Sequence, residues 1–355
     1  MKKILNLSQS FLLALMLVFG SFMAQAQDEE DDAPQLSISG SIDTYYRLGL
    51  NVANDPEAGG NYQAPTSSFA NLPGFSLGMA NIILGMDGEK SGFVADLVFG
   101  PRGSDAVFAS PMYSSTGQIV NQLYGYWNVS DAVTLTIGNF NTFLGYEVIS
   151  PTANFNYSTS YMFSYGPFSH TGVKADFTFG DFTMMTALMN STDLTEFSPD
   201  GQYYAGLQFG YGGAYLNFLF DDDFFQADLT AGWDLTESLY LGVNGTYATD
   251  NFFGAALYLQ TAVSDDFSLG LRGEYFSDEG VGALPFLAGG GPAGADLLPG
   301  SAIDFTLSAN YSVGNLTFIP EFRVDIFDED VIVPEAGEAA QGALASFLVA
   351  AVYSF

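Results

Sequence analysis

Polar and apolar residues alternate with a period of two along most of this chain. In the segment LSISGSIDTYYRLGL, residues 36–50, the even positions are mostly apolar and the odd positions mostly polar. Residues 301–313 and 315–327 repeat this pattern, and the last twelve residues, LASFLVAAVYSF, place their aromatic residues on one parity. Successive side chains of a strand point to opposite faces, so the pattern predicts strands with one apolar and one polar face.

About sixteen segments of this kind follow one another. We therefore predict an all-β fold, a transmembrane up-and-down antiparallel β-barrel of about sixteen strands. Weak alternation near 118, 182 and 252 leaves fourteen to eighteen strands open. A strand of about ten residues, tilted by about 40°, matches an apolar band about 25 Å tall. The segments begin near residues 36, 74, 92, 118, 132, 169, 182, 202, 213, 225, 238, 252, 266, 302, 315 and 344.

The lengths of the connections favour the same architecture. Every second connection is short, such as DGEKS, NVSDA and SVGN. The connections between them are mostly long, with short exceptions near 221–224 and 249–251. A barrel with both ends in the periplasm predicts short periplasmic turns and longer external loops, whereas a soluble sandwich gives no reason for such parity. The long connections are 52–72, 103–117, 144–168, 191–201, 278–301 and 328–343.

The chain begins with features of an exported protein. Residues 1–26 have two lysines, an apolar stretch and Ala24-Gln25-Ala26, as a cleavable signal peptide does. Residues 27–35 are an acidic stretch that we interpret as a flexible tail, so the barrel spans 36–355. The apolar stretch is shorter than the roughly 20 residues of a membrane-spanning helix. With no cysteine, the exported chain folds without disulfides.

Composition and charge change this picture in two ways. The net charge is −32, from 40 acidic and 8 basic residues, which excludes nucleic acid as a partner. Yet 48% of residues are hydrophobic and 15% aromatic, as a barrel with an apolar belt and polar ends requires. The basic residues expected at strand depth all fall on the polar parity, because a charge facing mid-bilayer lipid costs about 2–4 kcal/mol. They are Arg47, Arg102, Lys174, Arg272 and Arg323.

The apolar parity is expected to face lipid and lipopolysaccharide. Aromatic residues gather near strand ends, as in NFFGAALYL and DDFFQADL, which suggests interfacial aromatic girdles. The aromatic face of the last strand then touches lipid. Its final residue, Phe355, is expected to serve as the terminal signal for the barrel-assembly machinery.

Residues 135–177 resemble the signature region of the OmpL-like β-barrel porins. The matching positions are Gly138-Asn139-Phe140, Gly145-Tyr146-Glu147, Asn156-Tyr157-Ser158, and Pro167 with His170-Thr171-Gly172-Val173. Segments SGSIDTYYRL and VNQLYGYWNVSDAVTLTIG are similar to the family as well. The chain departs from it at Asn139, where the family often carries a basic residue. The resemblance implies an outer-membrane barrel and a porin, without a known solute.

The third external connection is the candidate for a constriction. It is about 24 residues long, from Gly145 to Phe168, and general porins fold their third loop into the lumen. A surface loop packed on the rim remains the alternative. The residues expected to line the narrowing are Tyr146, Glu147, Asn156, Tyr157 and Tyr161.

The ionisable residues on the polar parity are expected to line the lumen. Pairs two residues apart, Lys174 with Asp176, Arg272 with Glu274, and Arg323 beside Glu321 and Asp325, can brace the wall. An acidic excess remains after pairing and favours cations in a water-filled lumen. The predicted lumen-lining set is Asp43, Arg47, Asp96, Lys174, Asp176, Asp228, Asp234, Arg272, Glu274, Asp304, Glu321, Arg323 and Asp325.

Three other features carry weaker chemistry. His170 is the single histidine, and its neighbour Ser169 points to the opposite strand face, so the two do not form a ready catalytic dyad. The acidic stretches 221–223 and 327–330 fit a solvated rim better than a Ca²⁺ site, because 221–223 lacks spaced ligands and a glycine. The Gly/Pro-rich stretch 287–301 lacks the Gly-Lys-Ser/Thr ending of a phosphate loop. We predict no metal and no cofactor.

These patterns predict a monomeric or homotrimeric outer-membrane porin. It would admit small hydrophilic solutes passively, with a mild preference for cations, and would not be an enzyme. Three alternatives stay open: a structural or adhesive barrel closed by its loops, a barrel enzyme that depends on His170, and a soluble secreted β-protein.

Overall fold

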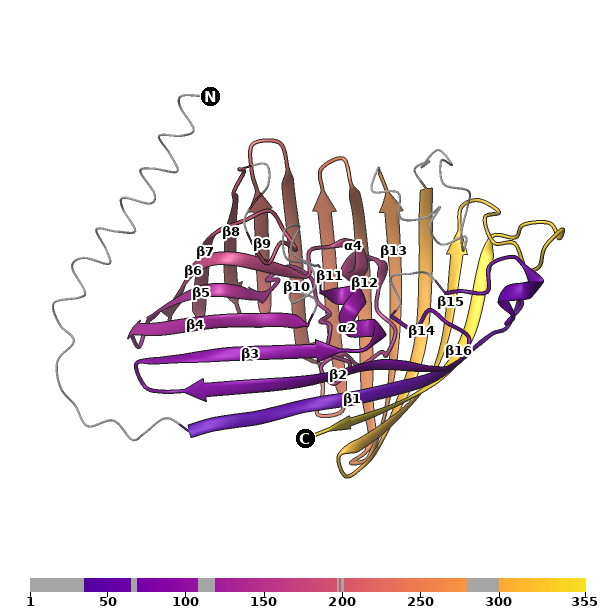
Figure 1. Ribbon diagram of the computed structural model, residues 1–355, viewed down its shortest axis with the longest axis horizontal. Coiled ribbons are helices and arrows are strands. Elements are labelled where there is room, and N and C mark those ends of the chain that lie inside the picture. The colour runs from indigo at the N-terminus through magenta and orange to yellow at the C-terminus, as the bar shows by residue number, and fades with distance from the viewer. Residues whose placement is uncertain (1–34, 65–68, 108–118, 197, 199–200, 280–299) are drawn as a thin grey trace.

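The computed structural model describes residues 35–64, 69–107, 119–196, 198, 201–279 and 300–355. These residues form sixteen antiparallel strands that close into one barrel, with every strand paired to its neighbours in the sequence and β1 paired to β16 (Figure 1). The predicted signal peptide and nearly all of the predicted tail, residues 1–34, lie outside the described residues.

The strands of the first half are β1 (Gln35–Gly49), β2 (Gly74–Asp87), β3 (Ser91–Phe99), β4 (Val120–Ser130), β5 (Val133–Asn141), β6 (Ser169–Phe179), β7 (Phe182–Met189) and β8 (Tyr204–Tyr211). Those of the second half are β9 (Ala214–Phe220), β10 (Phe225–Asp234), β11 (Leu239–Ala248), β12 (Phe252–Ser264), β13 (Phe267–Asp278), β14 (Gly300–Val313), β15 (Leu316–Phe327) and β16 (Ala343–Ser354). Short helices occur at η1 (Pro56–Ala58), α2 (Pro101–Ala106) and α4 (Tyr161–Tyr165). None of the described helices is long and apolar enough to cross a membrane.

The sequence prediction of the fold is confirmed. Each strand begins within two residues of its predicted start, and the described strands number sixteen. The parity of the connections also holds: the turns after even-numbered strands are short, and the connections 221–224 and 249–251 are the short exceptions among the others. The prediction succeeded because turn chemistry and period-two alternation are both local features of the chain.

Burial along the strands is inverted relative to a soluble protein. On β1, the outward side chain of Ile42 is 56% exposed, whereas the inward Asp43 is 3% exposed. The last strand has the same division, with Phe347 and Tyr353 exposed on the outer surface and Leu348 buried on the inner one. An apolar exterior around a polar interior is the arrangement that suits a barrel surrounded by lipid.

The two ends of the sheet close on each other through main-chain hydrogen bonds. Gly40 and Phe355 exchange both of their N–H···O bonds, at 3.1 and 3.0 Å, and Ser41 to Gly49 pair with Ser354 to Ser346. Closure gives each of the sixteen described strands a paired neighbour on both sides, as an environment without water requires. The terminal Phe355 is therefore part of the seam of the barrel.

Two of the three helices lie inside the barrel rather than on its rim. Helices α2 and α4 belong to the second and third long connections and appear in the middle of the barrel in front of β11 and β12 (Figure 1). The prediction that Arg102 lies at strand depth was wrong. It lies on α2, one turn beyond β3, because Gly100 takes a positive φ of 94° and Pro101 ends the strand and begins the helix.

Candidate pore constriction

The third loop, residues 142–168, fills part of the barrel interior. Tyr157 and Tyr161 are both completely buried within it, and Glu147 and Asn156 are nearly so. A buried segment without regular structure leaves its main-chain N–H and C=O groups without partners unless the surroundings supply them. The inner wall of this barrel supplies them with charged side chains.

Two wall glutamates bind the main-chain N–H groups of the loop. Glu321 on β15 accepts from the N–H of Tyr157 at 2.8 Å and of Ser158 at 3.1 Å. Glu274 on β13 accepts from the N–H groups of Tyr161 and Met162, both at 2.8 Å. The second pair opens helix α4, whose first N–H groups have no partner within the helix.

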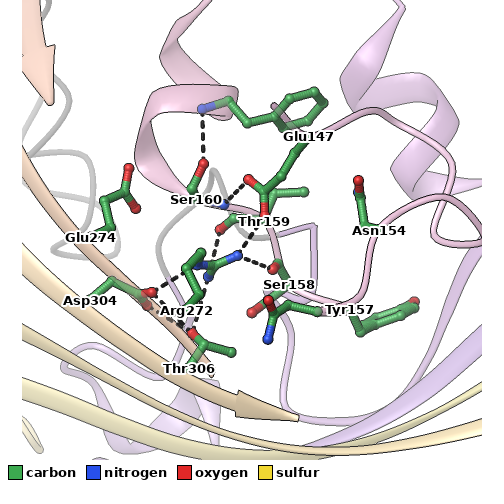
Figure 2. A network of polar contacts seen from close by, with 12 residues as sticks. Glu147, Asn154, Tyr157, Ser158, Thr159, Ser160, Arg272, Glu274, Asp304 and Thr306 are labelled. Carbon is green, nitrogen blue, oxygen red and sulfur yellow. Dashed lines mark hydrogen bonds and ion pairs between the residues drawn. The ribbon is translucent and has the colours of Figure 1, made fainter. Parts of the chain in front are cut away.

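Two wall arginines bind the carbonyl groups between these points. Arg272 donates to the carbonyl oxygen of Ser158 at 2.6 Å, and Arg323 donates to that of Thr159 at 2.8 Å. Figure 2 shows Arg272 between the loop carbonyls on one side and Asp304 on the other. The main chain of residues 157–162, hereafter the anchored segment, is thus bound by side chains of opposite charge.

The same arginines belong to a buried ion-pair network. Arg272 pairs with Glu147 of the loop at 2.8 Å and with Asp304 of β14 at 2.9 Å. Arg323 pairs with Asp304 and Asp325, both at 2.8 Å. All these side chains are at most 3% exposed. Breaking one partner of a buried pair costs about 3–5 kcal/mol, so the network rigidly orients the anchored segment.

The predicted pairings were correct in part. Lys174 with Asp176 and Arg323 with Asp325 form as expected. No ion pair of Arg272 with Glu274 occurs among the described residues, because Glu274 turns to the N–H groups of α4 and Arg272 turns to Glu147 and Asp304. Spacing along one strand could not reveal these partners, because Asp304 lies on the neighbouring strand β14 and the others belong to a loop more than one hundred residues away.

The Tyr157 side chain fixes the loop to the seam of the barrel. Its hydroxyl donates to Asp43 of β1, its ring lies 5.7 Å from that of Tyr45, and the Arg102 guanidinium lies 5.1 Å from its centre. Burial raises the pKa of the Tyr157 hydroxyl well above its usual value, so it remains a neutral donor. Arg102 also donates to the carbonyl oxygens of Ile149 and Tyr157, at 2.8 and 3.1 Å. Helix α2 therefore supports the third loop.

The remaining predicted residues on the wall have different surroundings. Asp96 accepts from Asn81 and Asn121, and Asp228 accepts from Asn217, Asn244 and the N–H of Gly145. Arg47 is buried and donates to the carbonyl oxygen of Tyr62, whereas Asp234 is exposed at the end of β10. In the loop, Tyr146 reaches Tyr240 through their hydroxyls at 3.1 Å, and Asn156 donates to Ser308 at 2.7 Å.

The opposite wall, β4 to β6, leaves open space. A cavity of about 390 Å³ lies against its inner face and is lined by Tyr124, Tyr126, Phe140, Lys174 and Asp176 among others. The Lys174–Asp176 pair, at 2.8 Å, has side chains 25% and 38% exposed. It is thus far more accessible than the buried network. The lumen is asymmetric, with the loop bound to one side and polar space on the other.

His170 is fully buried beside the third loop. Its Nε2 lies 3.0 Å from the Thr142 hydroxyl, and the ring of Phe143 lies 5.2 Å away. A catalytic histidine needs a nucleophile or an acid and a path for a substrate. The contacts of His170 are those of a packed wall residue.

A fourth-loop residue holds the end of the third loop. Asp193 accepts from the N–H groups of Phe168 and Ser169, at 2.7 and 2.9 Å. Burial raises the pKa of this carboxyl to about 6, although both N–H groups oppose the shift. Neither the contacts of Asp193 nor the structural role of Arg102 could be predicted from the sequence, because neither residue stands in a recognisable motif.

The acidic loops show no metal-type grouping. Among the described residues, no three His, Cys, Asp or Glu side chains gather as a metal site would require. Residues 222–223 and 328–330 are exposed. Residues 287–299 of the Gly/Pro-rich stretch lie outside the described residues, and 300–301 already belong to β14.

Comparisons with known proteins agree with this architecture. The family model described as "Putative beta-barrel porin-2, OmpL-like" matches residues 35–355. The fold is similar to that of the outer membrane channel DcaP of Acinetobacter baumannii, with a TM-score of 0.55, 10% identity, and coverage of 93% of this chain and 100% of that one. No curated protein sequence matches the chain.

Two further solved structures share the fold. For a mutant of the Rh. blastica porin the TM-score is 0.52 at 11% identity, over 90% of this chain and 100% of that one. For the trimer form of OmpT of Vibrio cholerae it is 0.51 at 12% identity, over 91% and 100%. At these identities the likeness concerns the fold alone.

Proposed function

The chain belongs to the OmpL-like β-barrel porin family, and from that premise we propose that it is a passive diffusion channel for small hydrophilic solutes with a mild preference for cations. The general assignment, an outer-membrane barrel of the porin type, comes from the family and the fold. The finer statements are ours. The observation that carries them is the third loop, which enters the lumen, binds one wall, and leaves polar space along β4 to β6.

The proposed route runs along the β4–β6 wall. This wall presents hydroxyl, amide and charged side chains to its cavity, with Gln122, Thr136 and Lys174 among them. On the other side, the anchored segment and its apolar neighbours are packed against β12 to β15. Solutes would therefore pass the loop on one side, and the loop would set their size limit.

The proposed cation preference follows from the buried charges around the lumen. Among the described residues, nine carboxylates are buried against four arginines. Charges in a weakly polarisable interior act on ions over longer distances than charges in water. The carboxylates are Asp43, Asp96, Glu147, Asp228, Glu274, Asp278, Asp304, Glu321 and Asp325, and the arginines are Arg47, Arg102, Arg272 and Arg323.

The proposal includes the biogenesis of the protein. Residues 1–26 would be removed as an export signal, and residues 27–34 of the predicted tail would remain ahead of β1, which begins at Gln35. Phe355 would present the C-terminal strand to the barrel-assembly machinery before it pairs with Gly40. The outer apolar face would then contact lipid and lipopolysaccharide, as a monomer or as a homotrimer. No residue would act chemically on a solute.

A second candidate is a structural or adhesive barrel with a closed lumen. The complete burial of Tyr157 and Tyr161 favours it, because apolar side chains of the loop pack against the wall over a wide area. The two candidates differ in whether the space along β4 to β6 continues through the barrel.

Single-channel current across a planar bilayer, measured in a KCl gradient, separates these candidates. We expect discrete steps with a cation-selective reversal potential. Steps with anion selectivity would keep the porin and refute the role of the buried carboxylates. The absence of steps from protein shown to be folded would replace the porin by the closed barrel.

A further inference from the structure

The open space along β4 to β6 contains an accessible pair of opposite charges. The Lys174 ammonium lies 2.8 Å from the carboxylate of Asp176, and the two side chains are 25% and 38% exposed. Both line the cavity of about 390 Å³, whose volume falls in the range of about 300–1,000 Å³ typical of small-molecule sites. In the part of the chain that the structure describes, no other Asp, Glu, Lys, Arg or His side chain lines this cavity. The cavity therefore offers one positive and one negative group to a solute.

Both charged groups keep hydrogen-bonding capacity for a ligand. An ammonium has three donors, and a carboxylate has two acceptor oxygens. Among the described residues, the polar contact of these two groups is the bond from Lys174 Nζ to Asp176 Oδ2, so two donors and the Oδ1 atom remain. The Phe140 ring, 5.6 Å from Lys174 Nζ, favours the charged ammonium in this position. Arg272 and Arg323 differ in this respect, because both are buried and bound to the third loop.

Two aromatic rings with fixed positions line the same cavity. The Tyr126 hydroxyl donates to Asp87 of β2, and its ring lies over Gly92, where a Cβ would lie 2.5 Å from the ring carbon Cζ. The Phe143 ring lies over Gly206 of β8, where a Cβ would lie 2.7 Å from its Cζ. Both rings are half-buried and so present part of their surface to the cavity. The apolar part of the lining is thus in place before a solute arrives.

The charged pair selects among solutes by their charge. A solute with one negative charge would be attracted by Lys174 and repelled by Asp176, and a solute with one positive charge would meet the reverse. A zwitterion satisfies both groups, because its carboxylate accepts from the ammonium of Lys174 and its ammonium donates to Asp176. In an α-amino acid a single carbon atom separates these two groups, so both can reach a pair whose charged atoms are 2.8 Å apart.

We propose that this cavity is a binding site for zwitterionic α-amino acids with apolar side chains. Lys174 binds the carboxylate of the solute, Asp176 binds its ammonium, and the rings of Tyr126 and Phe143 contact its side chain. This inference rests on the proposed function and names its solute class, since the solute must enter the lumen along the β4–β6 wall.

The test is saturation-transfer difference NMR on the folded barrel in detergent micelles at neutral pH, with micelles alone as the background. The probe is L-phenylalanine. Phenylpropanoate, which lacks the ammonium, and phenethylamine, which lacks the carboxylate, are the charged controls with the same ring. We expect phenylalanine to bind about tenfold more tightly than either control, the effect of one charge-assisted hydrogen bond at a partly exposed site.

Two variants exchange the preference of the site. Lys174→Gln and Asp176→Asn each remove one charge from a partly exposed pair, so folding is retained. Each should weaken phenylalanine binding about tenfold. Lys174→Gln should also strengthen the binding of phenethylamine, and Asp176→Asn that of phenylpropanoate, which a merely structural role would not produce. Asp234→Asn is the matched control, because Asp234 is exposed at the end of β10 and does not line the cavity; it should leave all three affinities unchanged.

The outcomes separate this inference from the proposed function. Equal affinities for the three probes, or unchanged preferences in both variants, would overturn the site. Current steps in the planar bilayer without binding of phenylalanine would leave the channel intact and overturn the site as well. Binding of phenylalanine that both variants weaken, in a barrel without current steps, would support the site and refute the open channel.

Discussion

The carboxylate of Glu321 carries the most informative prediction about the third loop. It is 1% exposed and accepts three hydrogen bonds: from the N–H of Tyr157 at 2.8 Å, the N–H of Ser158 at 3.1 Å, and the Ser308 hydroxyl at 2.7 Å. In Glu321→Gln, one carboxylate oxygen becomes an amide group that can only donate. If the amide group replaces Oε1, the N–H of Ser158 faces another donor and loses its acceptor.

The magnitude follows from these three bonds. Leaving one buried N–H unsatisfied costs about 1–3 kcal/mol, and the other two bonds weaken when their acceptor loses its charge. The neutral amide is easier to bury than a carboxylate, which offsets part of the loss. We expect the anchored segment to be destabilised by about 2–4 kcal/mol, which corresponds to an increase of about 30-fold to several hundred-fold in its detached population. Glu321→Ala removes all three bonds and should have a larger effect.

Hydrogen exchange at the amides of Tyr157 and Ser158 measures that population directly. The exchange rate in the folded barrel should rise by the factor above in Glu321→Gln and further in Glu321→Ala. Asp176→Asn is the control, since it removes a lumen carboxylate whose partner is Lys174 rather than the loop. Unchanged exchange in Glu321→Ala would refute the reasoning, because the loop would then be held by packing alone.

Three further perturbations test other parts of the structure. Gly270→Val places a Cβ 2.2 Å from the Phe155 ring and should lower the free energy of unfolding in urea by about 1–3 kcal/mol. Gly273→Val on the outer face, where the nearest atom lies at 3.5 Å, should change it little; equal losses would contradict the packing argument. Asp193 has a raised pKa of about 6, so the folded state binds its proton more tightly, and this stabilisation is present below pH 4 and lost as the pH rises through 6. Urea midpoints of Asp193→Asn should lack that component; identical pH profiles of wild type and variant would contradict it. Lys174→Gln removes the cation of a partly exposed pair, so stability should change by less than about 1 kcal/mol while the reversal potential moves toward stronger cation selectivity. An unchanged reversal potential would place the ion route elsewhere.

The period-two alternation was sufficient to predict the barrel, because a lipid environment excludes most other arrangements of the strands. A strand with its main chain in a membrane must pair on both sides, and a side chain must face either lipid or lumen. The polarity of a residue such as Ile42 or Asp43 is therefore enough to predict whether its side chain faces lipid or the lumen. Arg102 shows the limit of this logic. A basic residue on the expected parity suggested a strand, but Gly100 and Pro101 ended the strand first.

The sequence by itself determined the strands, their order, the outer and inner faces, the parity of the connections and the loop with the signature motif. Each of these depends on residues close together in the chain. Only the tertiary structure determined which groups the charged side chains of the inner wall bind. Glu321, Glu274, Arg272 and Arg323 were expected to line the lumen and to brace the wall in pairs two residues apart, and they also bind the main chain of a loop that is over one hundred residues away in sequence. The N–H and C=O groups of a buried main chain need hydrogen-bond partners, and the wall residues that lie next to them supply these. Alternation along a strand holds no information about which distant segment will pack against that strand.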